Sequence, residues 1–323
     1  MAESSTTTQQ QQPLRIGTRR SNLAMVQAEG IRDSLRKIAP DRSYEIVALR
    51  TLGDKDQSKA LYSFGAKSLW TTELEEKLTS GELDVIVHCL KDMPTGLPDS
   101  CELAAIPARD DARDALVVRA GLPYTSLQTL PDGAVVGTSS VRRSAQLRRL
   151  YPHLRFANLR GNVETRLAKV DRLERVGLAH RITQYLGSKD GGILHAVGQG
   201  ALGLEIRKGD EPMRQLLNQL ADRKSTLACL AERSLMRTLE GGCSVPIGVE
   251  TDWSSSSSHD DHLTMSAIVV SLDGSQSVHD TIDASVRTVD EATALGEDLA
   301  ARLVKAGAHA ILNDINANRP AKD

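Results

Sequence analysis

The chain has 323 residues, enough for two or three domains, and its 40% hydrophobic and 25% charged residues are ordinary for a soluble globular protein. A formal net charge of -2 and only 3% aromatic residues argue against a nucleic-acid partner, which requires a positive surface or rings on which bases stack. No apolar run reaches membrane-spanning length, so no membrane partner is expected.

Residues 1–13 are polar and rich in Ser, Thr and Gln, and they lack the basic start and apolar centre of a signal peptide. We predict a disordered tail there. The four cysteines include no pair with C-x-x-C spacing, which predicts neither a metal site nor a disulfide framework. These features together predict a cytoplasmic protein.

Strands and helices are expected to alternate from residue 14 onward. Strands are predicted at 14–18, 44–49 and 83–89, with helices at 22–38 and 68–78 between them. This alternation is typical of an α/β domain with a largely parallel sheet. A second unit begins near Asp114, and its predicted strands are 115–118, 134–137 and 154–159. Another strand is predicted at 201–206, after a glycine-flanked crossing at residues 198–200.

The last third of the chain has a different pattern. A helical run at 226–239 is followed by two strand-like runs, 263–271 and 277–282, and then by one long amphipathic helix at 291–311. This order predicts a small α+β domain at the C-terminus.

Arginines gather where predicted strands give way to helices. Arg19 follows the first strand, Arg142 and Arg143 follow the Gly137-Thr-Ser-Ser140 turn, and Arg160 and Arg166 belong to a similar stretch. Cations in a first helical turn oppose the helix dipole, a cost that is better tolerated where an anion binds the free N–H groups. The planar guanidinium fork favours a carboxylate-rich ligand, and phosphate is the other candidate.

Two further residues are candidates for a chemical role. Asp92 is an acid among cations, so it is either a salt-bridge partner or a carboxylate that handles a proton or stabilises a passing cation. Cys243 lies between Gly242 and Pro246 on a tight loop that follows a helical run. It is either a small packed thiol or a thiol that a large group must reach.

These stretches together resemble the porphobilinogen deaminase family, also called hydroxymethylbilane synthases. The resemblance runs from Leu14 through nearly all of the chain, in the order Gly17-Thr-Arg-Arg-Ser21, Thr51-Leu-Gly-Asp-Lys55, Val87-His-Cys-Leu-Lys-Asp-Met-Pro94, Val136-Gly-Thr-Ser-Ser-Val-Arg-Arg143, Leu159-Arg-Gly-Asn-Val-Glu-Thr-Arg-Leu167, Ala196-Val-Gly-Gln-Gly-Ala-Leu-Gly203 and Glu240-Gly-Gly-Cys-Ser-Val-Pro246.

The resemblance implies two periplasmic-binding-protein-like lobes with mixed, mostly parallel sheets, and a small α+β C-terminal domain. The implied first lobe is 14–110 with 201–218, the second is 111–200, and the third domain is 219–323. The implied reaction is the deamination and polymerisation of four porphobilinogen molecules on a covalently bound dipyrromethane cofactor. It releases hydroxymethylbilane for heme biosynthesis, and the enzyme is expected to be a monomer.

The resemblance also implies roles for individual residues. Asp92 would be the catalytic carboxylate and Cys243 the covalent cofactor attachment. Further cofactor contacts would come from Cys89, Lys91, Thr138, Ser139, Ser140, Arg142, Arg143, Arg160 and Arg166. Substrate contacts would come from Arg19, Ser21 and Arg181.

The chain departs from the family pattern in two places. Cys89 stands where the family usually has serine, which keeps the size but weakens a hydrogen bond. The family also has an apolar strand and a glycine-rich turn after the position of Asp171, and from Gly161 to Gly191 we predict no strand at all. An inactive or impaired isoform with the same fold, which only binds carboxylate-rich pyrrole ligands, is therefore the alternative function. A passive binding protein and a nucleic-acid binder are less favoured.

Overall fold

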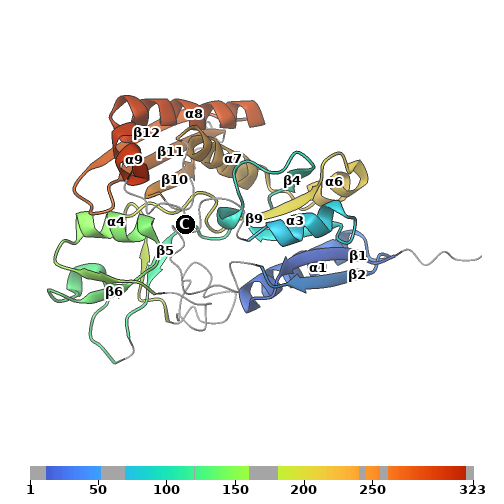
Figure 1. Cartoon of the computed structure of the whole chain (residues 1–323), viewed down its shortest axis with the longest axis horizontal. Helices are drawn as coiled ribbons and strands as arrows, with labels where there is room; N and C mark the ends of the chain where they lie inside the picture. The colour runs from blue at the N-terminus through green and yellow to red at the C-terminus, as the bar shows by residue number, and fades with distance from the viewer. Residues whose placement is uncertain are drawn as a thin grey trace, which may run out of the picture.

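The computed structural model describes residues 12–51, 70–119, 121–159, 181–239, 245–254 and 261–317. Figure 1 shows two α/β lobes beside each other beneath a C-terminal α+β domain. The predicted fold class, two α/β lobes with mixed sheets and a smaller third domain, is confirmed. None of the helices in these ranges is long and apolar enough to cross a membrane.

The first lobe is built on a five-stranded sheet in the order β2-β1-β3-β9-β4. Strands β1 and β2 are parallel, as are β1 and β3, whereas β9 lies antiparallel between β3 and β4. Because β9 comes from the far end of the second lobe, the chain crosses between the lobes twice. The strands are β1 (Leu14–Arg19), β2 (Tyr44–Leu49), β3 (Val85–Cys89), β4 (Cys101–Ala105) and β9 (Leu202–Arg207).

Helices α1 (Asn22–Ile38), α3 (Thr72–Thr79) and α6 (Glu211–Asn218) pack against this sheet. The predicted bounds of α1 and β2 are confirmed to the residue. Helix α1 buries residues at helical spacing and begins at an N-cap hydroxyl, which are the two signals that the sequence displays. Strand β4 and helix α6 were not predicted, because neither shows a long periodic pattern.

The second lobe contains two separate pairs of strands. Strand β5 (Asp114–Leu116) pairs antiparallel with β8 (Gln184–Leu186), and β6 (Val135–Gly137) pairs parallel with β7 (Arg155–Ala157). Helix α4 (Val141–Leu150) and the 3-10 turn η3 (Leu127–Thr129) complete the described part of the lobe. Within those ranges no ladder joins the two pairs into one sheet.

The prediction that no strand lies between Gly161 and Gly191 is wrong, because β8 occupies Gln184–Leu186. The strand is only three residues long, so it cannot display the period-2 alternation by which strands are recognised. Residues 160–180 lie outside the described ranges.

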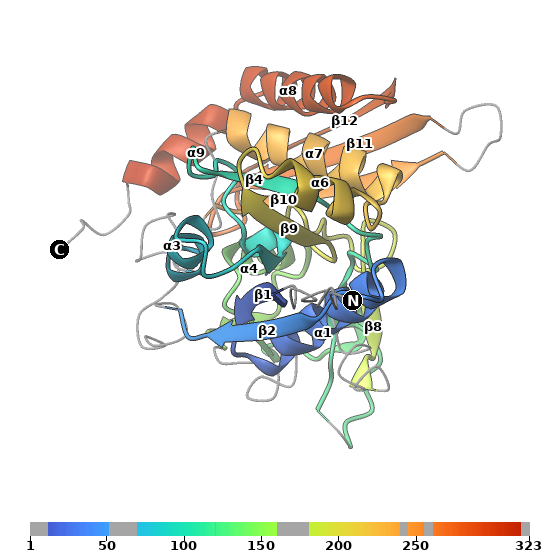
Figure 2. The same cartoon turned by 90° about the vertical axis from the view of Figure 1, so that its right-hand side faces the viewer.

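The C-terminal domain contains a three-stranded antiparallel sheet of β10 (Ile247–Trp253), β11 (His262–Val270) and β12 (Ser277–Ser285). Its helices are α7 (Arg223–Thr238), α8 (Val289–Lys305) and α9 (Ala308–Ala317). Figure 2 shows α7 and α8 running alongside each other over the sheet. The predicted single helix at 291–311 is wrong. The structure has α8 (Val289–Lys305) and α9 (Ala308–Ala317), divided at Gly307, whose φ is 108°. Only glycine adopts that backbone conformation without strain.

Two crossover segments, 106–113 and 187–201, connect the lobes, and both contact the buried Glu232 of helix α7. The Glu232 carboxylate accepts from Arg109 Nη1 at 2.6 Å, from Arg109 Nη2 at 3.1 Å and from the Gly198 N–H at 2.8 Å. Its fourth donor is Thr251 Oγ1 on β10, at 2.7 Å. Burial would raise the pKa of Glu232, but the Arg109 guanidinium outweighs it and lowers the pKa.

The crossover segments also touch each other at Gly200. The Asp110 N–H donates to Gly200 O at 3.2 Å, and Arg109 Nε donates to Gln199 O at 2.7 Å. A Cβ at Gly200 would lie 2.7 Å from Asp110 O, so the close approach of the two backbones requires glycine.

Gly200 and Gly209 form a matched pair for testing this contact. Both have left-handed backbone, with φ of 84° and 81°, but a Cβ at Gly209 would meet nothing within 4 Å. We expect Gly209→Ala to lower the free energy of unfolding by about 1–2 kcal/mol through backbone strain alone. Gly200→Ala should lower it by at least about 1 kcal/mol more, because the crossovers must separate. Equal losses of unfolding free energy for the two variants in urea titrations would contradict a close contact between the crossovers at Gly200.

Candidate functional site

Asp92 lies on a short turn that is anchored on both sides. Strand β3 ends at Cys89, and the 3-10 turn η2 (Leu90–Asp92) follows directly. The buried Leu90 donates its N–H to Ala201 O at 3.0 Å, and its backbone carbon would lie 3.2 Å from a Cβ at Gly198. The second crossover therefore fixes the turn, while the Asp92 side chain stays 27% exposed.

Arg19 lies beside Asp92 because β1 and β3 are parallel neighbours whose carboxyl ends meet at one edge of the sheet. Arg19 Nη1 lies 3.9 Å from Asp92 Oδ2. The guanidinium carbon of Arg19 lies 3.9 Å from the centroid of the Trp70 ring, within the range of a cation–π contact. Trp70 was missed by the sequence analysis, because nothing local links it to Arg19.

Three other predicted residues of this lobe surround the same edge. Ser21 Oγ accepts from the Ala24 N–H at 3.4 Å and caps helix α1. Cys89 Sγ donates to Gln27 Oε1 at 3.4 Å, so the thiol keeps a polar partner on α1. Lys91 is half-buried and precedes Asp92 in the same turn.

The Thr138-Ser139-Ser140 turn of the second lobe is held by its own hydroxyls. Thr138 Oγ1 accepts from the Ser140 N–H at 3.2 Å, and Ser140 Oγ accepts from the Arg143 N–H at 3.3 Å as the N-cap of α4. Ser139 Oγ donates to Leu159 O. In this structure the three side chains therefore shape the turn.

Arg142 and Arg143 share one buried carboxylate, that of Asp114 at the start of β5. Arg142 Nη1 donates to Asp114 Oδ2 at 2.7 Å, and Arg143 Nε donates to Asp114 Oδ1 at 2.7 Å. The Arg142 side chain is only 5% exposed, and that of Arg143 is 21% exposed. This geometry places Arg142 inside the lobe and Arg143 nearer the surface.

Asp114 was not singled out in the sequence, although it is buried between two arginines. Burial would raise the pKa of Asp114, but the guanidinium groups of Arg142 and Arg143 outweigh burial and hold the pKa far below its ordinary value. The pKa of Asp114 in the folded protein lies below its unfolded value of about 3.9. The ionised carboxylate therefore stabilises the fold above that pH, and this stabilisation is lost as the pH falls toward the folded pKa.

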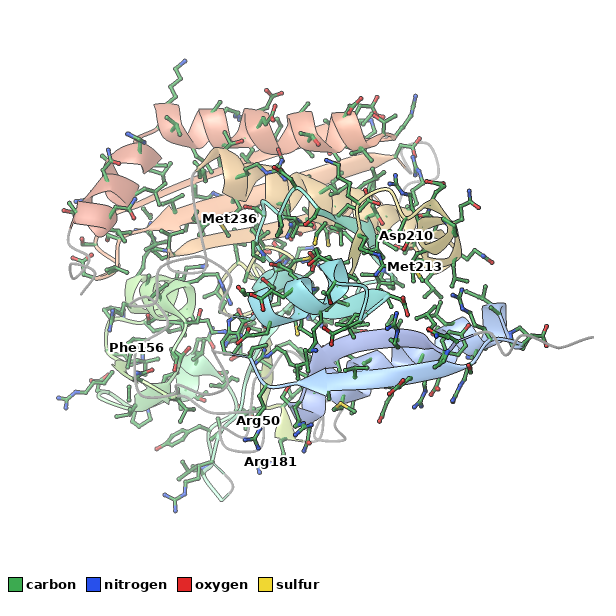
Figure 3. The ribbon with its side chains drawn as sticks, turned by 45° about the vertical axis from the view of Figure 1, so that its right-hand side comes forward. Arg50, Phe156, Arg181, Asp210, Met213 and Met236 are labelled. Atoms are coloured by element: carbon green, nitrogen blue, oxygen red, sulfur yellow. The ribbon has the colours of Figure 1, made fainter. Side chains whose placement is uncertain are left out.

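Arg181 lies just before β8 and is half-buried; Figure 3 labels it. Cys243, Arg160 and Arg166 lie outside the described residues. Across the described ranges, no group of three His, Cys, Asp or Glu side chains is placed to hold a metal ion.

The described residues suit a ligand rich in carboxylates. Arg19 and Arg143 both lie at a transition from strand to helix, one in each lobe, and both side chains reach the surface in part. The Asp92 carboxylate lies beside Arg19 and is also partly exposed. Two α/β lobes with such groups, joined by two crossovers, are typical of a protein that binds a small anionic ligand.

Two family models cover most of the chain. That of the porphobilinogen deaminase, dipyromethane cofactor binding domain matches residues 14–215, and that of the porphobilinogen deaminase, C-terminal domain matches residues 226–305. The chain therefore belongs to the porphobilinogen deaminase family, whose cofactor is dipyrromethane.

Curated relatives agree with this assignment. The porphobilinogen deaminases of Yarrowia lipolytica, Eremothecium gossypii and Saccharomyces cerevisiae are 52%, 50% and 48% identical to this chain. In the same order, the three alignments cover 93%, 95% and 95% of this chain and 93%, 98% and 98% of the relatives' lengths. The last two alignments span 325 residues, more than the whole chain of 323, so they contain positions at which this chain has no residue.

Proposed function

We propose that the protein deaminates and polymerises four porphobilinogen molecules on a dipyrromethane cofactor and releases hydroxymethylbilane. In each addition the aminomethyl C–N bond breaks and ammonia leaves. A C–C bond then forms to the free ring carbon of the last pyrrole, which loses its proton. After four additions, water cleaves the C–C bond between the tetrapyrrole and the cofactor, so that the product methylene gains the hydroxyl group and the cofactor ring carbon gains the proton. The observation that carries the proposal is the Asp92 carboxylate, partly exposed and 3.9 Å from Arg19 at the carboxyl ends of parallel strands.

Asp92 is proposed as the catalytic carboxylate. Loss of ammonia leaves positive charge on the pyrrole, and a fixed carboxylate stabilises that charge and accepts the ring proton. The anchoring of Leu90 by Ala201 supports this role, because an electrostatic catalyst must be held in place before the reaction. Arg19 beside it can bind a substrate carboxylate.

The cationic and hydroxyl residues are proposed to bind the acetate and propionate groups of the pyrroles. The partly exposed Arg19 and Arg143 are best placed for direct contact. For Arg142 the burial favours a supporting role over direct contact. The remaining proposed contacts are Ser21, Cys89, Lys91, Thr138, Ser139, Ser140, Arg160, Arg166 and Arg181.

The cofactor supplies the terminal pyrrole to which the first substrate is joined, and Cys243 is proposed to hold it through a thioether. Placement in the cytoplasm as a monomer is also proposed. Within the described residues, Cys101 and Cys229 are free thiols, which supports a reducing compartment.

The attachment is tested by intact mass. Cys243→Ser should give an inactive protein with the mass of the bare chain, because serine cannot form the thioether, whereas the unmodified protein should carry the added mass of two pyrroles. Cys229→Ser is the control, because that thiol is buried and its pKa is raised by burial to about 12. Full activity at the bare-chain mass would exclude the proposed attachment.

Asp92→Asn tests the catalytic role. The variant should keep the cofactor, since the amide preserves the shape of the turn, but turnover should fall by a factor on the order of a hundred or more, because the amide neither carries charge nor accepts a proton. Porphobilinogen consumption and cofactor mass should be measured on the same sample. Turnover near that of the parent would assign Asp92 to a structural ion pair with Arg19.

Three observations favour the alternative function, an inactive or impaired isoform. The two strand pairs of the second lobe are not joined in the described ranges, and Val135 on β6 is 66% exposed. The aligned positions that this chain lacks are consistent with a lost strand.

Restoring a strand tests this alternative. Inserting an apolar strand and a glycine turn after Asp171 should raise both the melting temperature and the turnover. Paired backbone groups and covered apolar surface should contribute several of the roughly 5–15 kcal/mol that stabilise a domain. A glycine-serine insert of the same length is the control. Equal melting temperature and turnover before and after restoration would show that the lobe is complete as it stands.

A further inference from the structure

The Asp114 carboxylate joins two neighbouring arginines of one helix to a strand of the same lobe. Its Oδ2 accepts from Arg142 Nη1 at 2.7 Å, and its Oδ1 accepts from Arg143 Nε at 2.7 Å and lies 2.6 Å from Arg143 Nη2. Successive residues on a helix point in directions about 100° apart. The two guanidinium groups would therefore diverge if one carboxylate did not draw them together.

The burial of the three side chains differs in a way that sets their roles. Asp114 is 2% and Arg142 5% exposed, and Arg142 Nη1 also donates to Leu194 O at 2.6 Å. Arg142 thus neutralises the negative charge of the buried Asp114 carboxylate from inside the lobe. Arg143 is the partly exposed member, so the net positive charge of the trio is directed to the surface there.

Gln199 links this trio to the crossover between the lobes. Its buried side-chain amide donates from Nε2 to Asp114 Oδ1 at 3.0 Å and to Ala112 O at 2.7 Å, and its Oε1 accepts from Arg142 Nη2 at 3.4 Å. Its backbone carbonyl accepts from Arg109 Nε. Asp114 is therefore fixed to the crossovers as well as to α4.

We propose that Asp114 is a positioning residue that orients Arg143, through the shared carboxylate and the buried Arg142, toward a carboxylate of the pyrrole ligand. The inference rests on the proposed function for the nature of the ligand. It adds a residue that does not touch the ligand and assigns Arg142 and Arg143 different tasks.

Removing the charge of Asp114 separates positioning from simple neutralisation. If Asp114 only reduced positive charge, Asp114→Asn would expose two cations and tighten the binding of an anionic ligand. If Asp114 positions Arg143, the same variant should weaken binding, because the guanidinium loses its fixed direction and must be ordered by the ligand. The two roles predict opposite signs.

Asp84→Asn is the matched control. Asp84 also lies between two arginines, with Oδ1 3.0 Å from Arg15 Nη2 and 3.7 Å from Arg207 Nη2. It immediately precedes β3, at the opposite end of that strand from Asp92. The control loses a comparable ion pair without altering the arginines of the second lobe.

The first readout is arginine modification by phenylglyoxal, followed by peptide mass spectrometry. We expect Asp114→Asn to raise the labelling rate of both Arg142 and Arg143 several-fold, and Asp84→Asn to leave both rates unchanged. The second readout is steady-state kinetics with porphobilinogen. We expect KM to rise roughly tenfold or more, the order expected for losing one charge-assisted hydrogen bond, with a smaller change in kcat. Unchanged labelling together with an unchanged or lower KM would overturn the proposal.

Gln199→Ala covers the case in which Asp114→Asn does not fold. It leaves both ion pairs but removes the amide that fixes Asp114, so labelling and KM should change in the same direction by a smaller factor. No change in either readout would overturn the proposal. If the unaltered protein neither carries the cofactor nor consumes porphobilinogen, the proposed function fails. The labelling readout then still decides whether Asp114 orders the two arginines.

Discussion

One buried carboxylate, that of Glu232, connects all three parts of the molecule. It belongs to the C-terminal domain, yet its donors include Arg109 from one crossover and the Gly198 N–H from the other. A fully buried ionised group is tolerated only when it is paired and hydrogen-bonded, and four donors satisfy this requirement here. The C-terminal domain therefore holds both crossovers. Any change in the relative orientation of the two lobes requires these crossover segments to bend.

The same crossovers lead to both candidate ligand-binding regions. On the side of the first lobe, Gly198 packs against Leu90, which begins the turn that carries Asp92. On the side of the second lobe, Gln199 contacts Asp114 and, through it, Arg143. Two adjacent residues of one segment, Gly198 and Gln199, thus hold the proposed catalytic carboxylate and the proposed ligand-binding cation. This arrangement relates the positions of the two groups through one short segment of the chain.

The sequence was sufficient for elements with strong local signals and insufficient where contacts act through space. Helix α1 shows both a cap and a periodic apolar face, so its bounds could be predicted to the residue. The three-residue strand β8 has too few positions to show alternation, and the single residue Gly307 divides a helix that otherwise continues its pattern. The roles of Trp70 and Asp114 arise only when distant segments meet, so no spacing in the chain indicates them.

The stacking of Arg19 on Trp70 has an optical consequence. The chain has two tryptophans, and the other, Trp253, lies on β10 of the C-terminal domain with its Nε1 donating to Lys224 O at 3.3 Å. A guanidinium over the face of an indole changes the electric field at that ring, and a ligand that draws Arg19 away would change it again. Trp70 is therefore an intrinsic fluorophore placed beside the proposed reaction centre, and Trp253 is an internal reference in a separate domain.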